Sequence, residues 1–366
     1  MKKLIRTHAA LLFAGVATFV VMGAGQSLYG PALPAFSRLF GVTVAEAGVL
    51  VSAHWVGCFI GVGFMYLRGA AITPRHALAL MAVGAGGVAA LAGWGLTLVA
   101  AVIFGIGYGM STAVFNPRVL RAFGDRGPSM LSLLNATFGL GAIAAPLVFV
   151  ALGSDPRWSF GMTSLFCALI WLGAGSAGDQ TLLPAGVVRP FRPHWGILTF
   201  GAVAIGLEAC LIGLGPTALI AAGVAETRAA ELLSAFFVVF LLSRTALIFT
   251  AHLIPSFALL TGAMAVATFS AFGAALLSPE VFFVALGAAT GLFFPGYYVT
   301  ASRKMGEDIR VPPTIIAGGL VGGIFAPLAV APMMAGLGEV GFFWVLGGVT
   351  SAMTVIAVLA LPRMQS

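Results

Sequence analysis

Charged side chains are scarce in this sequence. Only 8% of its 366 residues are Asp, Glu, Lys or Arg, 60% are apolar, and the mean hydropathy is +1.08. Soluble globular domains carry about 25% charged residues. The composition therefore excludes a soluble protein and makes lipid the solvent for most of the chain.

Motifs of common enzymes are also missing. The sequence has no Gly-x-x-x-x-Gly-Lys-Ser/Thr phosphate loop, no His-Glu-x-x-His metal motif and no Gly-x-Ser-x-Gly nucleophile motif. Its three cysteines, Cys58, Cys167 and Cys210, stand at no metal-ligand spacing and read as small apolar packing residues. These observations leave no positive case for an enzyme, and we expect no cofactor and no metal.

Long apolar runs are what the chain does contain. A helix that crosses a bilayer needs about 20 mostly apolar residues and satisfies its backbone polar groups internally. The pattern predicts twelve such helices, and no loop between them is long enough for a soluble domain. The predicted spans are 8–37, 44–67, 75–95, 97–122, 127–152, 158–178, 194–223, 229–250, 255–277, 281–302, 313–336 and 340–361.

The basic residues predict the orientation of these helices, because Lys and Arg in short loops stay on the cytoplasmic side. With the N-terminus inside, only Arg38, Arg157 and Arg228 lie on the outer side. We therefore expect an inner-membrane protein with both termini in the cytoplasm. Its net charge of +7 reflects this topology and indicates no nucleic-acid partner. The cytoplasmic set is Lys2, Lys3, Arg6, Arg68, Arg75, Arg118, Arg121, Arg126, Arg189, Arg192, Arg244, Arg303, Lys304, Arg310 and Arg363.

Two stretches in the first half recur in the second. The run Gly-Leu-Gly-Ala-Ile-Ala-Ala-Pro-Leu at 139–147 is echoed by Val-Gly-Gly-Ile-Phe-Ala-Pro-Leu at 321–328, and Gly-Pro-Ala-Leu at 30–33 by Gly-Pro-Thr-Ala-Leu at 215–219. The similar offsets indicate a parallel duplication of six helices. We predict an N-terminal six-helix bundle over 1–178, a Pro- and Arg-containing cytoplasmic linker over 179–193 and a C-terminal six-helix bundle over 194–366.

These residues resemble the major facilitator superfamily, and within it the fucose/proton and glucose–galactose/proton symporter-like branch. The similar runs are Phe-Asn-Pro at 115–117, Leu-Leu-Asn-Ala-Thr-Phe-Gly-Leu-Gly-Ala-Ile at 133–143, Gly-Pro-Ala-Leu-Pro at 30–34, Gly-Leu-Glu at 206–208 and Ser-Arg at 243–244. The resemblance implies an all-α membrane protein with two six-helix bundles, which moves a solute by rocking one bundle against the other.

The chain departs from that pattern where the branch carries acids. The loop between the second and third predicted helices, from Arg68 to Arg75, keeps its basic residues but lacks the usual Asp. The branch also places carboxylates in its first and fourth helices, where this chain has Gln26 and Thr112. Neither of these residues titrates. The resemblance assigns gating or conformational roles to Arg68, Arg75, Arg118 and Arg244.

Glu208 is the only acidic residue well inside a predicted span, and His54 is the second ionisable candidate. An ionisable group at bilayer depth is costly, so it is by default a functional candidate that faces the bundle interior. Glu208 is a candidate proton site or acceptor for a solute hydroxyl, and a packing role for it is equally open. His54 can exchange a proton near neutral pH, although a lone His on an apolar helix is more often structural. These two residues are the candidates for proton coupling.

Amide side chains complete the candidate solute site. Amides offer donors and acceptors without a charge, which suits a neutral sugar or polyol. Trp55, Tyr108, Phe138 and Tyr298 could add flat apolar contacts, with helix packing as the alternative. The predicted solute-binding set is Gln26, His54, Asn116, Asn135, Glu208 and Tyr297.

The predicted function is secondary transport of a small, neutral, sugar-like solute, with proton coupling and uniport both open. The expected partners are the solute, protons and the lipid bilayer, and we expect a monomer. One alternative is a drug or metabolite exporter of the same fold. Another is a non-transporting receptor or assembly factor built on a carrier scaffold.

Overall fold

The computed structural model describes residues 6–68, 72–123, 127–177, 192–250, 253–306, 308, 310–338 and 340–365. Most of the predicted linker, 179–191, lies outside the described residues. Within those residues the regular structure is helical throughout. The chain divides into two compact units, one formed by Met1–Val42 and Ala53–Ala185 and the other by Thr43–Ser52 and Gly186–Ser366.

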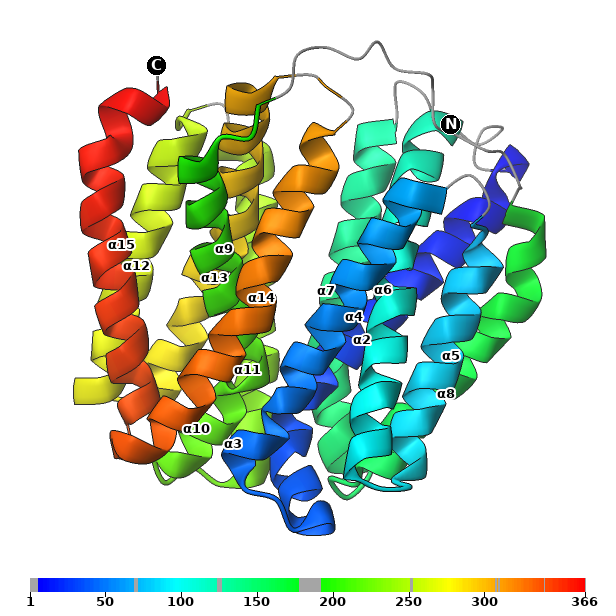
Figure 1. Ribbon diagram of the computed structural model, residues 1–366, viewed down its shortest axis with the longest axis horizontal. Helices are drawn as coiled ribbons and strands as arrows, with labels where there is room; N and C mark the ends of the chain where they lie inside the picture. The colour runs from blue at the N-terminus through cyan, green and yellow to red at the C-terminus, as the bar shows by residue number, and fades with distance from the viewer. Residues whose placement is uncertain are drawn as a thin grey trace. The chain divides into compact units, whose positions relative to one another are not determined.

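The first unit is built from long helices that pack through their sides. Helix α5 contacts both α6 and α8, and α2 contacts α7; α5 and α6 are seen side by side in Figure 1. The elements are α2 (Ala9–Phe40), α4 (Val49–Arg68, from Ala53 onward), α5 (Pro74–Ala90), α6 (Trp94–Ala122), α7 (Gly127–Ala151), α8 (Pro156–Gly173) and the short η3 (Ala174–Ala177).

The second unit repeats this manner of packing. Helix α9 contacts α14, α12 contacts α13 and α15, and α11 contacts α13; Figure 1 shows α12 and α15 running together. Its elements are α3 (Val44–Ala47) with the start of α4, α9 (Trp195–Gly213), α10 (Gly215–Ala221), α11 (Glu226–Thr250), α12 (Ser256–Leu276), α13 (Pro279–Met305), α14 (Val311–Gly336) and α15 (Gly341–Gln365).

Ten helices among the described residues are long and apolar enough to cross a membrane. The helices at the third and sixth predicted spans, α5 with 17 residues and α8 with 18, are not among these ten. The chain is thus a multi-pass, all-helical membrane protein. Exposed apolar side chains along the helices, such as Phe325 and Trp344, fit a lipid-facing surface.

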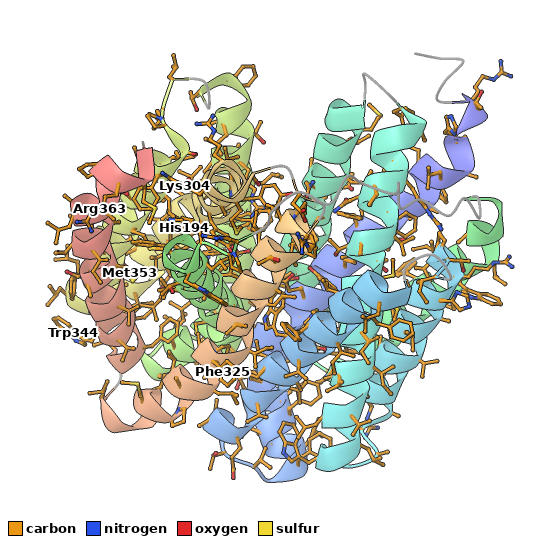
Figure 2. All side chains as sticks on the ribbon, turned by 45° about the horizontal axis from the view of Figure 1, so that its top comes forward. His194, Lys304, Phe325, Trp344, Met353 and Arg363 are labelled. Atoms are coloured by element: carbon orange, nitrogen blue, oxygen red, sulfur yellow. The ribbon has the colours of Figure 1, made fainter. Side chains whose placement is uncertain are left out.

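Polar side chains gather at the helix ends. Asp155 Oδ1 accepts the backbone N–H of Arg157 at the start of α8, and Ser278 Oγ accepts that of Val281 at the start of α13. Such caps satisfy donors that the helix leaves unpaired. In the second unit Lys304 Nζ donates to the carbonyl of Arg363 at 2.9 Å. In Figure 2, Lys304 and Arg363 are seen above Trp344 and Phe325.

The predicted spans 44–67 and 194–223 are divided in the structure, the first into α3 and α4 at Gly48 and the second into α9 and α10. Helix α9 ends at Gly213, Leu214 separates it from α10, and Pro216 lies in the first turn of α10. Proline has no N–H to give to the preceding turn, so it favours a helix start over a helix interior. The hydropathy pattern predicts a single helix over 194–223, and this prediction is wrong at Leu214.

Glycines bring the backbones of α4 and α6 into direct contact. A Cβ atom added at Gly105 would collide with the carbonyl oxygen of His54, and one at Gly109 with that of Cys58. From the other side, Gly57 and Gly61 face the backbone of α6 at Val102 and Ile106. Small residues spaced four apart let membrane helices approach this closely.

The same contact recurs between α11 and α13. Gly287 faces the carbonyl of Phe236, and Gly291 faces that of Phe240. Each residue of these pairs follows its counterpart in α4 and α6 by 182 residues, from 54 to 236, 58 to 240, 105 to 287 and 109 to 291. The two units therefore share an internal packing plan that is matched residue by residue.

This contact predicts that Gly105→Ala destabilises the protein. The added methyl group has backbone, rather than a flexible side chain, as its neighbour, and overpacking of this kind costs about 1–3 kcal/mol. Gly95→Ala on the same helix is the matched control, because nothing lies within 4 Å of its Cβ position. We expect a lower melting temperature in detergent for Gly105→Ala alone. Equal melting temperatures for the two variants would contradict the proposed contact.

Candidate functional site

In the first unit, His54 lies at the centre of a buried aromatic cluster. Its side chain is 1% exposed, and its ring centroid is 5.2 Å from that of Tyr29, 5.4 Å from Phe104 and 5.0 Å from Tyr108. Among the described residues its nitrogens meet only weak partners, Tyr29 Oη at 3.5 Å from Nδ1 and Cys58 Sγ at 3.6 Å from Nε2. This apolar setting favours a neutral imidazole that packs as a ring.

The same cluster holds Gln26. The Tyr108 hydroxyl donates to Gln26 Oε1 at 2.6 Å in a buried hydrogen bond between α6 and α2. The Tyr108 ring meets the rings of His54 and Trp55 edge-on, at interplanar angles of 79° and 75°. The structure thus brings Gln26 and His54 together through Tyr108.

The two asparagines of the predicted set differ in how far they are buried. Asn116 on α6 has its Oδ1 buried, without a hydrogen-bond partner among the described residues. Asn135 on α7 is exposed and makes an interaction of its own. Thr112 stands at the position where the symporter branch has an acid. Its hydroxyl donates to the carbonyl of Tyr108 at 3.3 Å, within α6.

In the second unit, Glu208 projects from α9. Its Oε2 atom is buried and has no hydrogen-bond partner among the described residues. The positive charge of Arg244 on α11 is near enough to act on the carboxylate. Arg244 is held in place, because its guanidinium carbon lies 4.3 Å from the Phe240 ring centroid and its Nε donates to the carbonyl of Gly291 at 3.0 Å.

Tyr297 occupies a different setting from the rest of the predicted set. It is fully buried on α13, and its hydroxyl donates to the carbonyl of Ile315 on α14 at 2.7 Å. Gly201 on α9 leaves room for its ring. The side chain therefore links three helices of the second unit, and its hydroxyl is already used.

Two of the four arginines predicted to take part in gating, Arg75 and Arg118, connect segments within the first unit. Arg75 donates to the carbonyl of Leu172 at 3.3 Å and lies 5.2 Å from the Trp171 ring centroid, which joins α5 to α8. Arg118 on α6 donates to the carbonyl of Ile72 at 3.3 Å. The side chain of Arg68 lies outside the described residues.

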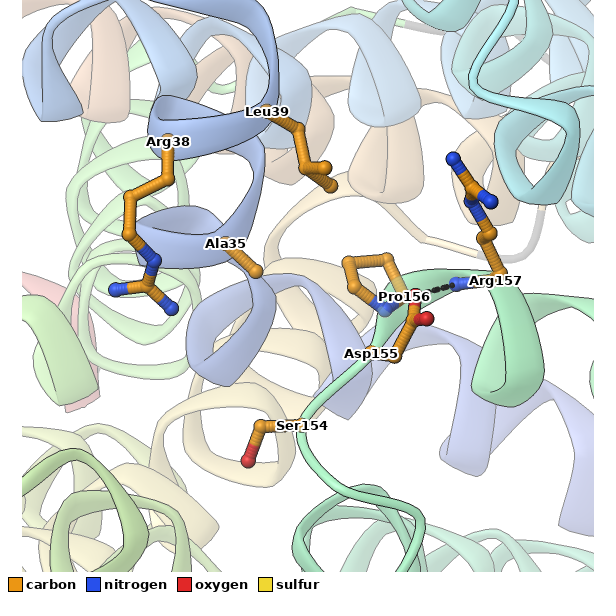
Figure 3. Close-up of a pocket in the computed structure, with 7 residues that line it drawn as sticks. All are labelled: Ala35, Arg38, Leu39, Ser154, Asp155, Pro156 and Arg157. Atoms are coloured by element: carbon orange, nitrogen blue, oxygen red, sulfur yellow. Dashed lines mark hydrogen bonds between the residues drawn. The ribbon is translucent and has the colours of Figure 1, made fainter.

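A hollow of about 430 Å³ lies at the end of the first unit where α2 finishes and α8 begins. Arg38 and Arg157 flank it from opposite sides, with Ser154 and Asp155 between them (Figure 3). None of the predicted solute-binding residues lines it, since those that are buried lie in the interior of each unit.

Sequence reasoning missed the closest partners of His54, namely Tyr29, Phe104 and Cys58. Helical spacing offered a signal for two of them. Cys58 lies four residues after His54 and therefore shares its helix face. Tyr29 lies three residues after Gln26 and therefore shares the helix face of that predicted site residue. Phe104 gave no such signal, because it comes from another helix.

The comparisons with known proteins identify the fold. No family model and no curated protein matches the sequence. Among solved structures, a D-xylose-proton symporter has a TM-score of 0.75 at 14% identity, covering 95% of this chain and 96% of its own. A peptide transporter, POT, has a TM-score of 0.77 at 12% identity, covering 97% and 95%.

The E. coli fucose:proton symporter, FucP, has a TM-score of 0.65 at 16% identity over 99% of both chains. A second structure of FucP is described as a major facilitator superfamily transporter. The resemblance seen in the sequence is thereby confirmed at the level of fold, and the chain has the major facilitator fold.

The ring cluster predicts how His54 responds to substitution. His54→Ala removes a ring that touches four others and leaves a cavity, which costs about 2–4 kcal/mol by analogy with large-to-small core changes. His54→Phe keeps the ring, and Phe236 occupies the matching position on α11. We expect a lower melting temperature for His54→Ala and a near-normal one for His54→Phe. If both variants melted alike, packing would not be the role of this ring.

Proposed function

We propose that the chain is a secondary transporter that moves a small, neutral, polar solute of sugar-like chemistry by alternating access. We further propose twelve transmembrane helices in two six-helix bundles, with α5 and α8 crossing the membrane in addition to the ten helices that meet the length and hydropathy requirement. The shared fold with sugar and peptide transporters supports a transport role. The substrate class rests on the chemistry of the buried polar groups.

These groups in the first unit are uncharged. Gln26 offers an amide held by Tyr108, and Asn116 offers a buried carbonyl oxygen with no donor among the described residues. A buried acceptor left without a donor costs about 1–3 kcal/mol. A solute hydroxyl would satisfy it without bringing a charge into the protein interior. This combination of donor and acceptor suits a polyol better than an ion.

The proposal of proton coupling rests on the surroundings of Glu208. It is the only acidic residue in the interior of a helix whose carboxylate has a buried, unpartnered oxygen within the described structure. When ionised, the carboxylate is stabilised by Arg244. When protonated, it becomes neutral and gains a hydrogen-bond donor. A group with two such states can link solute binding to proton binding.

Uptake into proteoliposomes tests the transport function directly. A panel of neutral sugars and polyols, charged metabolites and lipophilic drugs separates the candidate functions. Saturable uptake of a neutral solute supports the proposal. Transport of charged or lipophilic compounds alone would favour the exporter alternative. A tightly bound partner protein with no flux of any solute would favour a receptor or assembly factor.

The coupling role predicts a selective defect in Glu208→Gln. Glutamine keeps the shape and much of the hydrogen bonding but cannot release a proton. Accumulation of solute under an imposed pH gradient should fall to the level of equilibration, while exchange of labelled for unlabelled solute continues. Undiminished pH-driven accumulation would refute the assignment. A loss of affinity with no change in pH response would indicate a uniporter.

We also propose that the protein lies in the inner membrane as a monomer with both termini in the cytoplasm. Leu277 and Leu253 form a matched pair for testing the orientation, since both are leucines that lie between helices, are 76% and 68% exposed, and have no positive φ. The native cysteines are buried. A membrane-impermeant maleimide should label Leu277→Cys in intact cells and Leu253→Cys only after permeabilisation. The reverse pattern would invert the topology.

A further inference from the structure

The length of the Tyr108–Gln26 hydrogen bond defines how the amide of Gln26 is turned. At 2.6 Å it is typical of an O–H···O bond and shorter than the usual range of an N–H···O bond. The phenol therefore donates, and the amide oxygen accepts. Gln26 Nε2 is left with its two hydrogens and bonds to no other side chain among the described residues. The amide presents a donor rather than an acceptor.

The ring of Tyr108 is itself fixed in place. It stands edge-on to His54 with centroids 5.0 Å apart, and His54 is enclosed in turn by Tyr29 and Phe104. Gly105 and Gly109, on either side of Tyr108 in sequence, allow α4 to approach until His54 reaches this ring. A phenol held on several sides loses little further freedom when it bonds to Gln26.

The internal repeat gives Gln26 a counterpart. The spacing of 182 residues, here from 20 to 202, also relates α2 to α9, because Gly141 faces the carbonyl of Val20 and Gly322 faces that of Ala202. The same spacing pairs position 26 on α2 with position 208 on α9. At matching places, one unit has an amide held by a phenol and the other has a carboxylate near a guanidinium. The chemistry of the two positions is thus divided, uncharged in the first unit and charged in the second.

We infer that Tyr108 is a positioning residue that locks Gln26 as a hydrogen-bond donor to an uncharged oxygen acceptor of the solute, a hydroxyl or carbonyl oxygen. The inference rests on the proposed transport function and specifies its recognition step. Tyr108 acts through Gln26, and solute recognition by this pair is independent of the proton chemistry at Glu208.

Tyr108→Phe tests the positioning role, because it keeps the ring against His54 and removes only the hydroxyl. Without the hydrogen bond from the Tyr108 hydroxyl, Gln26 can rotate its amide and turn the carbonyl toward the solute. We expect KM for the solute identified in the uptake panel to rise about threefold to tenfold, in line with the loss of one hydrogen bond. The maximal rate, the melting temperature and the pH profile of uptake should stay unchanged.

A double-mutant cycle separates positioning from packing. In a Gln26→Ala background, Tyr108→Phe should raise KM no further, since the group that it positions is gone. Thr350→Val is the control, because it also removes a buried hydroxyl, one whose hydrogen bonds lie within α15 of the second unit, and it should leave KM unchanged. Additive effects of the two first-unit substitutions would show that Tyr108 acts elsewhere.

Solute analogues test the direction of the hydrogen bond. Replacing one solute hydroxyl at a time by fluorine keeps a weak acceptor, whereas replacing it by hydrogen keeps none. If Gln26 donates, one position should tolerate fluorine better than hydrogen in the wild type, and this preference should vanish in Tyr108→Phe.

The outcomes distinguish this inference from the function on which it depends. Absence of uptake of every neutral solute by the wild type would remove the proposed function. Normal wild-type uptake with an unchanged KM in Tyr108→Phe would overturn the positioning role alone. A reduced maximal rate and a lower melting temperature with KM unchanged would make the hydroxyl a structural group.

Discussion

Direct contact between helix backbones at glycine is the constraint on which the interior of each unit depends. Where Gly105 and Gly109 meet the carbonyls of His54 and Cys58, no side chain separates α4 from α6. Lipid offers little hydrophobic drive for helices to associate, so membrane helices rely on this close packing and on interhelical hydrogen bonds. Because α4 approaches so closely, the His54 ring reaches Tyr108, and Tyr108 in turn reaches Gln26.

The repeated packing plan explains how two chemically different sites can occupy equivalent places. The glycines and the carbonyls that they meet recur at a spacing of 182 residues, which preserves the backbone arrangement. Side chains away from these contacts are free to differ. The first unit has a ring of imidazole at position 54, and the second has a phenyl ring at the matching position, Phe236, stacked 5.4 Å from Phe283.

Burial gives the charged and uncharged sites different costs. In an amide bonded to a phenol, the acceptor is satisfied and the remaining donor is neutral, so the free-energy cost of burying it in an apolar interior is small. A buried carboxylate oxygen without a donor is far more costly, and the guanidinium of Arg244 offsets part of that cost. A residue retained at such a cost fits a role in which its protonation changes, as proposed for Glu208.

The sequence by itself determined the membrane-spanning helices and the fold. Hydropathy and helix length act locally along the chain, since each helix satisfies its own backbone hydrogen bonds, and ten of the expected helices meet those requirements among the described residues. It also identified Glu208 and His54 as ionisable residues inside helices. Proline alone does not mark a helix end, since α2 accommodates Pro31 and Pro34 in its interior. Pro216 was therefore no sufficient signal for the break at Leu214.

Only the tertiary structure decided which polar groups meet. Gln26 and Tyr108 are 82 residues apart, and no local pattern predicts that a phenol on one helix reaches an amide on another. The same holds for Arg244 beside Glu208, and for Tyr297, whose hydroxyl is spent on a carbonyl of α14. Helical periodicity specifies the face on which a side chain lies. Its partner depends on how closely the helices approach, and that distance is set by backbone contacts between glycines far apart in the chain.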